Sequence, residues 1–528
     1  MNLRRKRMML MDGQWYGYLR TASGNPLTLQ NAKRLRQLTI YGNAVQDGTP
    51  SPDAPVEVQL CGDRTGNLLD VTRISGTQIE VTDNKIYLSG YACSTRISPK
   101  AFLEMTGLNP GDTITCSNDT EIIHGVANSI LGRVSFSNLK GGGDFILRLH
   151  TTRTSTIPSD FNNDNYGSLI LYGANQADES GEKLVIISNL AIYKGSYTAD
   201  TLPAYEPYGY KVSGRAEGLN LFTSDESKWQ IQTYKYFKIP VDGTTTLQMK
   251  LKPGKSIPST LYVGYTITGY ASDAGISWLI ANGAYDNSGV NMMSNSNGYI
   301  SMYPPYLFDE MLDAFDIMLV QGSYTAETIP PYEPYQPPQD FAVYLPEQIA
   351  KVGDVADEVV LDFEKRTAEL KNNVGSMTMS DSYSGGTSTI DELVRFYHGT
   401  TPKRRISPST NIIDVMSDIY EADTWNNINV GSMDKQFVIA GNPNTQVVNV
   451  RVPKSVIGGE TNELMNAWAA NNPATVYYVL DTPVTTDITS LQQWDAMPQV
   501  SGTVTLTLSA EVDPSGAEAV YYSKERGE

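Results

Sequence analysis

The peptide GSYTADTLPAYEPY, residues 195–208, returns as GSYTAETIPPYEPY at residues 322–335. The two copies agree at 11 of 14 positions, and each follows a strand-like run, LAIYK or IMLVQ. The prolines of the repeated peptide fix its backbone, and its tyrosines can pack back onto a sheet. The end of each copy therefore predicts a stiff extended segment. We interpret the repeat as the last core strand and exit of a duplicated module. The alternative is a proline motif that binds a partner.

A second, shorter repeat lies upstream of each copy. GDRTGNLLD, residues 62–70, precedes the first, and GRAEGLNLF, residues 214–222, precedes the second. Between these landmarks, short β-branched and aromatic runs alternate with Gly, Asn, Asp and Pro, which is the pattern of strands and turns. The sequence therefore predicts two β-sandwich modules, at residues 67–208 and 220–335, joined by a linker at 209–219.

The segments before and after the two modules differ from them in residue composition. Residues 1–36 begin with four consecutive basic side chains, Arg4 to Arg7, which predict a basic arm that anchors the chain on an acidic partner surface; the alternative is a disordered tail. Residues 37–66 form a head or attachment segment. Residues 336–528 predict a β-rich C-terminal domain with one short helix at about 461–471, which Pro473 would end.

Composition narrows the possible partners. The 528 residues carry a formal net charge of −18, which would repel nucleic acid and anionic membranes. No apolar stretch approaches the roughly 20 residues of a membrane helix, so we expect no membrane insertion. The odd number and wide spacing of Cys61, Cys93 and Cys116 fit neither a disulfide framework nor a zinc site.

Several segments carry a resemblance to a known class of protein. QLTIYGNAVQDGTPSPDAPVEVQLCGDRTGNLLD, residues 37–70, resembles a head region of tail and baseplate structural proteins, of the tail-fibre or receptor-binding type, from phages and prophages of Gram-positive hosts. The GSYTA…PYEPY endings, VGDVADEVVLDFEKRTAEL (352–370) and NNPATVYYVLDTPVTTDIT (471–489) are similar to segments of the same proteins. The resemblance implies a mostly β fold of tandem antiparallel β-sandwiches, jelly-roll and carbohydrate-binding-module-like, with one short helix in the C-terminal domain.

The resemblance also implies a role. It implies a virion protein of the tail tip, baseplate or fibre, assembled in the host cytoplasm. Such a protein would bind other tail proteins through its N-terminal region, form homotrimers and contact a host surface glycan. It implies neither catalytic residues nor a cofactor. Two alternatives remain open: an architectural collar, whisker or baseplate spacer, and a tail-associated polysaccharide hydrolase.

The sequence contains few residue patterns typical of metal-binding or catalytic sites. The three histidines, His124, His150 and His398, are not spaced as metal ligands, so we predict no metal site. Asp160, Asn162 and Asp164 stand at alternate positions, faintly like a calcium loop. Asn165 stands where the sharp turn needs glycine, so a polar turn is the simpler interpretation. Asp309 and Glu310 lie beside aromatic residues and are interpreted as a solvated loop rather than a catalytic pair.

Aromatic residues distinguish the two modules. The second is rich in Tyr and contains tryptophan, whereas the first contains no tryptophan. Sugar rings expose apolar faces that stack on aromatic rings, while polar neighbours bind their hydroxyls. What the shared fold requires should occur in both copies, so the excess predicts function in the second module. The alternative is that these rings fill the core or a subunit interface. The candidate glycan-binding residues are Trp229, Tyr262, Tyr270, Trp278, Tyr285 and Tyr299.

Overall fold

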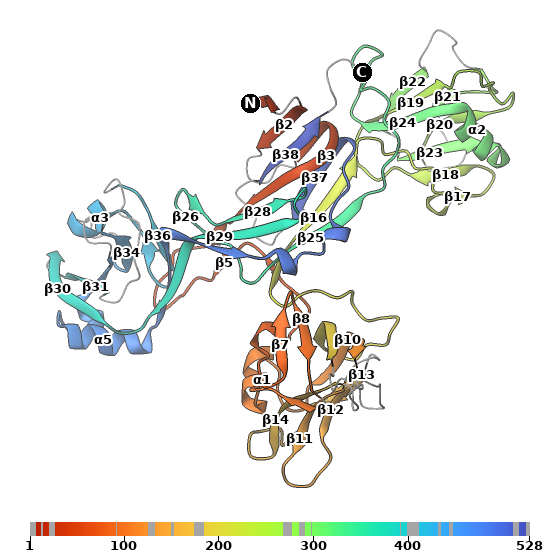
Figure 1. Ribbon diagram of the computed structural model, residues 1–528. Helices are drawn as coiled ribbons and strands as arrows, with labels where there is room; N and C mark the ends of the chain where they lie inside the picture. The colour runs from red at the N-terminus through yellow and green to blue at the C-terminus, as the bar shows by residue number, and fades with distance from the viewer. Residues whose placement is uncertain are drawn as a thin grey trace.

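The computed structural model describes residues 7–11, 14–20, 27–90, 92–124, 133–148, 153–173, 184–267, 277–284, 291–296, 298–390, 392–398, 411–430, 435–442, 447–509 and 517–523. Strands dominate these residues, nearly all described strand pairs are antiparallel, and the helices are short. The predicted mostly β fold class is confirmed. Three units project from a central sheet domain (Figure 1).

The central domain gathers strands from the whole length of the chain. Its sheet curls around one core that includes Leu38, Val343 and Leu370. The sheet comprises β1 (Arg7–Met11), β2 (Gln14–Arg20), β3 (Leu27–Tyr41), β6 (Asp63–Arg64), β16 (Tyr210–Gly218), β25 (Gln339–Leu345), β28 (Glu358–Asp362), β29 (Thr367–Met379), β32 (Val415–Ser417), β36 (Ala474–Asp487), β37 (Gly502–Ser509) and β38 (Ala517–Ser523). Small elements beside it are β4 (Ala44–Gln46), β5 (Val58–Leu60), β26 (Lys351–Val352), β27 (Val355–Ala356), η4 (Thr489–Leu491) and η5 (Trp494–Ala496).

This sheet corrects three of the predicted boundaries. The described part of residues 1–36 forms strands β1, β2 and the start of β3 rather than an arm, whereas Arg4, Arg5 and Lys6 lie outside the described residues. The predicted linker, 209–219, is strand β16, which pairs with β6, β25 and β37. The predicted C-terminal domain, 336–528, is divided, because its two ends belong to the central sheet. Strand β1 pairs with its neighbour β2, but β2, β3 and β16 also pair with strands more than a hundred residues away, which local sequence did not reveal.

Each projecting unit is inserted between two paired strands. Module 1 lies between β6 and β16, where Arg64 pairs with Tyr210. Module 2 lies between β16 and β25, and the third unit extends the β29–β36 pair. Because paired strands bring the two ends of an insert together, each unit leaves and rejoins the sheet at nearly one point. Neighbouring termini are what make domain insertion tolerable to a fold.

Module 1 is a sandwich of two antiparallel sheets around a shared core, with orders β13-β10-β15-β8-β7 and β12-β11-β14-β9. Its elements are η1 (Val71–Arg73), β7 (Ile79–Thr82), β8 (Lys85–Leu88), β9 (Ala92–Ser94), α1 (Pro99–Thr106), β10 (Thr113–His124), β11 (Arg133–Asn138), β12 (Phe145–Arg148), β13 (Arg153–Thr156), β14 (Tyr166–Tyr172) and β15 (Leu184–Lys194). Helix α1 was not predicted, although its signals are local. The Ser98 hydroxyl caps it, Pro99 begins it, and Gly107, at φ 68°, ends it.

Module 2 repeats this design, with sheet orders β17-β18-β23-β20-β21 and β22-β19-β24. Its elements are η2 (Glu226–Lys228), β17 (Gln230–Ile231), β18 (Lys235–Lys238), β19 (Thr245–Leu251), β20 (Tyr262–Thr266), β21 (Ser277–Ile280), β22 (Asn291–Asn295), β23 (Tyr299–Tyr303), η3 (Pro305–Leu307), α2 (Phe308–Ala314) and β24 (Phe315–Gln321). The core includes Leu247, Val263 and Met302, all fully buried. Helix α2 lies just before the last strand, whereas α1 precedes β10 in module 1, so the helices are not equivalent.

The repeated peptides occupy the same position in both modules. Thr115 Oγ1 donates to the Gly195 carbonyl (2.9 Å), and Thr246 Oγ1 donates to the Gly322 carbonyl (2.8 Å). Both glycines have positive φ, 114° and 113°, a conformation that favours glycine. The final strands β15 and β24 each pair with the strand that carries the threonine. The predicted duplication of a last strand and its exit turn is confirmed.

The ends of the repeats fasten the modules to the central sheet. Glu333 accepts hydrogen bonds from the backbone N–H and the hydroxyl of Thr503 in β37, both at 2.7 Å. Glu206, the matching residue of the first repeat, accepts from the Gly66 N–H (3.0 Å) and pairs with Lys211 of β16. The Pro-Tyr-Glu-Pro-Tyr end is therefore a docking segment as well as a spacer.

The third unit contains the predicted helix. Its sheet has the order β30-β31-β35-β34-β33. Helix α5 runs over Asn462–Asn471 and is capped by the Thr461 hydroxyl, which accepts from the Leu464 N–H. Two shorter helices of this unit, α3 and α4, were not predicted. The remaining elements are β30 (Tyr383–Ile390), β31 (Leu393–His398), β33 (Glu421–Ala422), α3 (Trp425–Val430), β34 (Val438–Gly441), β35 (Val448–Pro453) and α4 (Lys454–Ile457).

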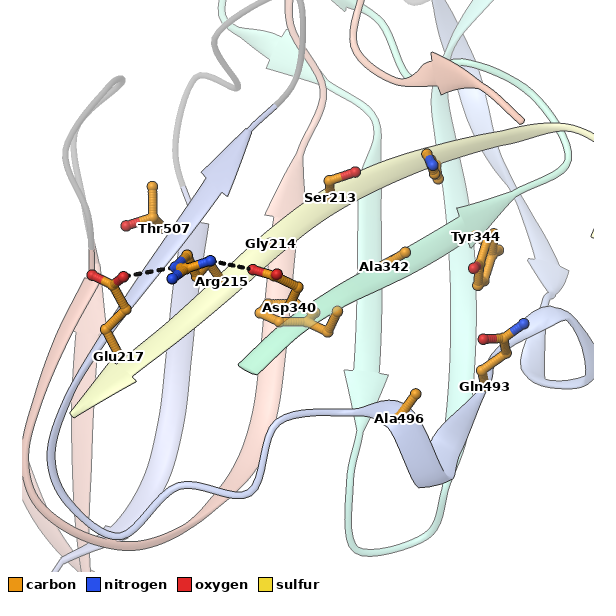
Figure 2. A pocket seen from close by; sticks show the side chains of 12 residues that line it. Ser213, Gly214, Arg215, Glu217, Asp340, Ala342, Tyr344, Gln493, Ala496 and Thr507 are labelled. Carbon is orange, nitrogen blue, oxygen red and sulfur yellow. Dashed lines mark hydrogen bonds and ion pairs between the residues drawn. The ribbon is translucent and has the colours of Figure 1, made fainter. Parts of the chain in front are cut away.

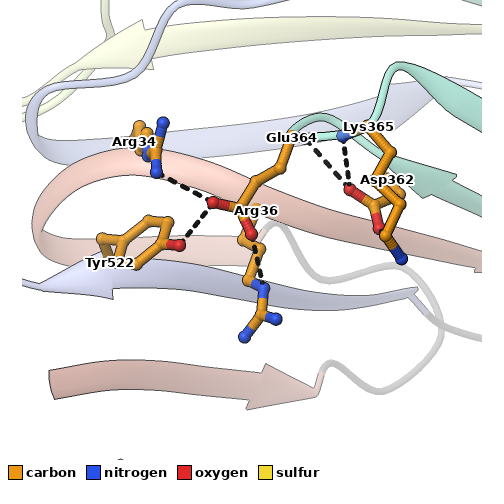
Figure 3. A network of polar contacts seen from close by, with 6 residues as sticks. All are labelled: Arg34, Arg36, Asp362, Glu364, Lys365 and Tyr522. Atoms are coloured by element: carbon orange, nitrogen blue, oxygen red, sulfur yellow. Dashed lines mark hydrogen bonds and ion pairs between the residues drawn. The ribbon is translucent and has the colours of Figure 1, made fainter. Parts of the chain in front are cut away.

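A polar cluster ties the two ends of the chain to one hairpin turn (Figure 3). Glu364, between β28 and β29, binds Arg34 Nη2 and Arg36 Nε, each at 2.8 Å, and accepts a hydrogen bond from the Tyr522 hydroxyl. The Arg34 guanidinium also lies 4.4 Å from the centre of the Tyr522 ring. One carboxylate thus joins β3 to β38.

Candidate functional site

One face of the five-stranded sheet in module 2 is lined with aromatic side chains. Side chains alternate between the two faces of a strand. In β20, Val263 and Tyr265 point into the core, so Tyr262 points to the opposite, outer face. Tyr303 lies directly opposite Tyr262 on β23 and shares that outer face.

Four outer rings form a closed group, which we call the aromatic face: Tyr234, Tyr262, Trp278 and Tyr303. Tyr234 lies 5.0 Å from Tyr303 and 6.1 Å from Trp278, measured between ring centres. Tyr262 lies 5.5 Å from Trp278 and 6.1 Å from Tyr303. All four side chains are half-buried, so each packs against its neighbours while part of its surface stays open to solvent. Such packing holds the rings in place before any ligand arrives.

A second pair of rings continues the same outer face. Tyr236 and Tyr299 lie 5.9 Å apart in an edge-to-face arrangement. The Tyr236 hydroxyl donates to Gln230 Oε1 (2.9 Å) and accepts from Gln232 Nε2 (3.3 Å). Tyr236 is almost fully buried and supports the face, whereas Tyr299 is half-buried and remains available for contact.

The aromatic face carries no charge at neutral pH. Partial burial raises the pKa of the Tyr234 phenol above its ordinary value of 10, and the nearby phenols of Tyr303 and Tyr262 raise it further. The phenol therefore stays protonated, and its hydroxyl can both donate and accept hydrogen bonds. The face combines flat apolar rings with neutral hydroxyls, which suits a ligand of the same mixed character.

The structure places the six predicted residues in three different situations. Trp278, Tyr262 and Tyr299 lie on the outer face, as described above. Tyr270 and Tyr285 lie outside the described residues. The prediction for Trp229 is wrong, because this side chain is 6% exposed and belongs to the core.

The surroundings of Trp229 explain why it is buried. Its ring lies 4.7 Å from Phe237, 5.0 Å from Phe308 and 5.8 Å from Phe222. Its indole N–H donates to the Thr223 carbonyl at 2.9 Å. A polar local sequence suggested a loop at the surface, but the fold brings Phe222, Phe237 of β18 and Phe308 of α2 around the ring.

Two residues of the aromatic face, Tyr234 and Tyr303, were missing from the predicted set. The signal was present in the sequence. In YISMY, residues 299–303, the two tyrosines are four positions apart and therefore share one face of a strand. The same period of two relates Tyr234 to Tyr236.

Module 1 lacks this arrangement on the matching face. There β14 takes the place of β23, and its outer residues include Ile170 and Tyr172. Tyr172 is covered by the guanidinium of Arg133, 5.1 Å from its ring centre, and Arg133 pairs with Asp144. The two modules share a design, yet among their described residues only module 2 presents a group of adjoining open rings.

A shallow hollow of about 730 Å³ lies on the central sheet, beside β25 (Figure 2). Arg215 stands on its wall between two carboxylates, 2.6 Å from Glu217 and 3.0 Å from Asp340. Lys211, also on the wall, pairs with Glu206. Both basic groups are paired with carboxylates, and the five charges sum to −1, so the hollow has no positive charge left over to attract an anion.

Neither the calcium-like stretch nor the acidic pair forms a recognisable centre. Asn162 Oδ1 accepts from the backbone N–H groups of Asp164 and Asn165, and Asn165 Nδ2 donates to the Asp160 carbonyl, which makes this stretch a hydrogen-bonded polar turn. Asp309 and Glu310 are exposed, as predicted, but they lie in the first turn of α2 rather than in a loop. Across the described residues, no three His, Cys, Asp or Glu side chains are grouped as they would be around a metal ion.

Comparisons with known proteins gave no match: no family model, curated protein or solved structure is similar to this chain. Among the helices that the structure describes, none is long and apolar enough to cross a membrane.

Proposed function

We propose that this chain is a non-enzymatic structural protein of a phage tail, at the tip, baseplate or fibre, that contacts the host cell surface through the aromatic face of module 2. The observation that carries the proposal is the closed group of Tyr234, Tyr262, Trp278 and Tyr303 on an outer sheet face. Half-buried rings with neutral hydroxyls are suited to stacking on the faces of sugars. The resemblance of residues 37–70 to tail proteins supports the setting.

The difference between the modules supports a binding role for the rings. Both modules keep the repeated exit peptide, the threonine that donates to its glycine carbonyl (Thr115 or Thr246), and the antiparallel sandwich. Since module 1 folds without the aromatic face, the fold itself does not require those rings. A set of open aromatic side chains that packing does not demand is better explained by contact with something outside the chain.

The proposed assembly is a homotrimer, with the N-terminal region bound to other tail proteins. A trimer would present three aromatic faces to one cell. Linked sites of this kind can raise overall affinity by a factor of about 10² to 10⁴ over one site. Individually weak stacking contacts would then suffice for adsorption.

The test is adsorption of the phage to its host with single substitutions in this chain. Trp278→Ala should reduce adsorption, because it removes the ring that joins Tyr234 to Tyr262. Tyr172→Ala, on the matching face of module 1, is the control and should adsorb normally. Particles must assemble in both cases. Unchanged adsorption by the Trp278 variant would leave module 2 with an architectural role only.

A further inference from the structure

We propose that the ligand of the aromatic face is an uncharged chain of pyranose rings, and not a phosphate-containing or acidic polymer. This inference rests on the proposed function and names its ligand class. Three features of the outer face support it: the near absence of charge, the length of the row of rings, and the match between the rings and a sugar.

Charge is the first feature. The outer positions follow from strand register, since Tyr236 pairs with Ser301 and Gly264 pairs with both Ser301 and Trp278. Among the described residues of β18, β20, β21 and β23, Lys238, across from Tyr299, is the charged side chain on this face. Phosphate and carboxylate ligands are normally held by several Arg or Lys side chains. A single lysine at one end, in a chain of net charge −18, is poorly suited to a polyanion.

Length is the second feature. Tyr299 and Tyr303 lie at the two ends of β23 on the same face. Four residues of extended strand span about 13 Å at 3.3 Å per residue. The closed group of four rings lies at the Tyr303 end, and Tyr299 lies at the other. Contacts spread over that distance require more than one sugar ring, so the ligand is an oligosaccharide chain rather than a single terminal sugar.

Chemistry is the third feature. A pyranose presents a flat apolar face of C–H groups and a rim of hydroxyls. The four rings supply apolar surface, and the hydroxyls of Tyr234, Tyr262 and Tyr303 can donate and accept hydrogen bonds. An open-chain polyol phosphate offers no flat ring face to stack on. The same surface therefore discriminates against such a polymer by shape as well as by charge.

The experiment uses the full chain and a glycan array that carries uncharged hexose oligosaccharides of one to eight units, polygalacturonate oligomers and glycerol-phosphate polymer. We expect binding to uncharged oligosaccharides that strengthens from one to several units. Titration calorimetry on the best hit should give nearly the same affinity at 50 and 500 mM NaCl, because ion pairs are screened by salt and stacking is not.

Two matched variants sharpen the test. Trp278→Ala should weaken binding about tenfold, equivalent to about 1.4 kcal/mol, whereas Lys238→Ala should change it less than twofold. Circular dichroism of both variants checks that they fold. Binding confined to the acidic or phosphate polymers, with a large loss in Lys238→Ala, would overturn the ligand class while leaving a surface-binding function intact. Binding to nothing on the array, together with normal phage adsorption by the Trp278 variant, would overturn both.

Discussion

Asn220 should be among the most sensitive positions of module 2. Its side chain is 2% exposed and makes four hydrogen bonds. Nδ2 donates to the carbonyls of Ile317 (2.9 Å) and Glu333 (3.0 Å), and Oδ1 accepts from the N–H groups of Phe222 and Leu319, both at 2.9 Å. One side chain thus joins the entry of the module to its last strand and to the docking segment.

The substitution Asn220→Ala leaves those four backbone groups without their partner. Three belong to residues that are buried, Phe222, Ile317 and Leu319. A buried group that loses its hydrogen bond costs about 1–3 kcal/mol, and water entering the space left behind recovers part of that. We therefore expect the opening free energy of module 2 to fall by about 3–5 kcal/mol.

Hydrogen exchange of the full chain, followed by mass spectrometry, measures this change locally. A loss of about 4 kcal/mol corresponds to roughly a thousandfold faster exchange in peptides of β24. Module 1 is the internal control, because its own asparagine, Asn67, makes the matching bonds to Leu69 and Ile192. Asn67→Ala should accelerate exchange in β15 and leave β24 unchanged. A change below about 1 kcal/mol in Asn220→Ala, or equal acceleration in both modules, would refute the reasoning.

Three further predictions follow from individual contacts. Trp229→Ala should destabilise module 2 by about 3–5 kcal/mol, because the Trp229 ring packs against three phenylalanines. Trp278→Ala should destabilise it by about 1–2 kcal/mol. Equal losses in calorimetry would contradict the assignment of Trp229 to the core and Trp278 to the surface. Glu364→Gln should lower the free energy of opening of β38 by about 1 kcal/mol, because it weakens the ion pairs with Arg34 and Arg36. Hydrogen exchange in residues 517–523 should then be faster, and unchanged exchange would show that the cluster does not hold the strand. Burial raises the pKa of Asp357 to about 6, against the effect of the three N–H groups that bond its carboxylate, so the folded state holds this proton more tightly than the unfolded chain. Stability to urea should therefore increase as the pH falls from 7 towards 4, by at most about 3 kcal/mol, and Asp357→Asn should lose that dependence.

The mode of insertion has a consequence for how the modules are held. Module 2 is attached through both strands of a pair, β16 and β25, and through the Glu333 contact with Thr503. Module 1 is attached in the same way, by β6 and β16 together with Glu206. Two covalent connections and a carboxylate anchor restrict rotation more than a single linker would. The aromatic face is therefore displayed in a defined direction from the central sheet.

Local patterns in the sequence were enough to predict the elements whose causes are local. Period-two alternation predicted the strands, and the fourteen-residue repeat predicted the shared exit of the two modules. Helix α5 could be predicted because Thr461 caps it and a proline follows it. Two of the four rings of the aromatic face, Tyr262 and Trp278, were also predicted, because the second module is richer in aromatic residues than the first.

Only the tertiary structure decided what depends on distant partners. Residues 209–219 look like a polar linker, yet become a central strand because β37, almost 300 residues later, supplies hydrogen bonds along its length. Trp229 and Trp278 both stand in mixed polar sequence, but Phe237 and Phe308 enclose the first, while the second faces outward across β20. Alternation states which side chains share a face of a strand. It does not state which face becomes the core, because that depends on what the rest of the chain packs against it.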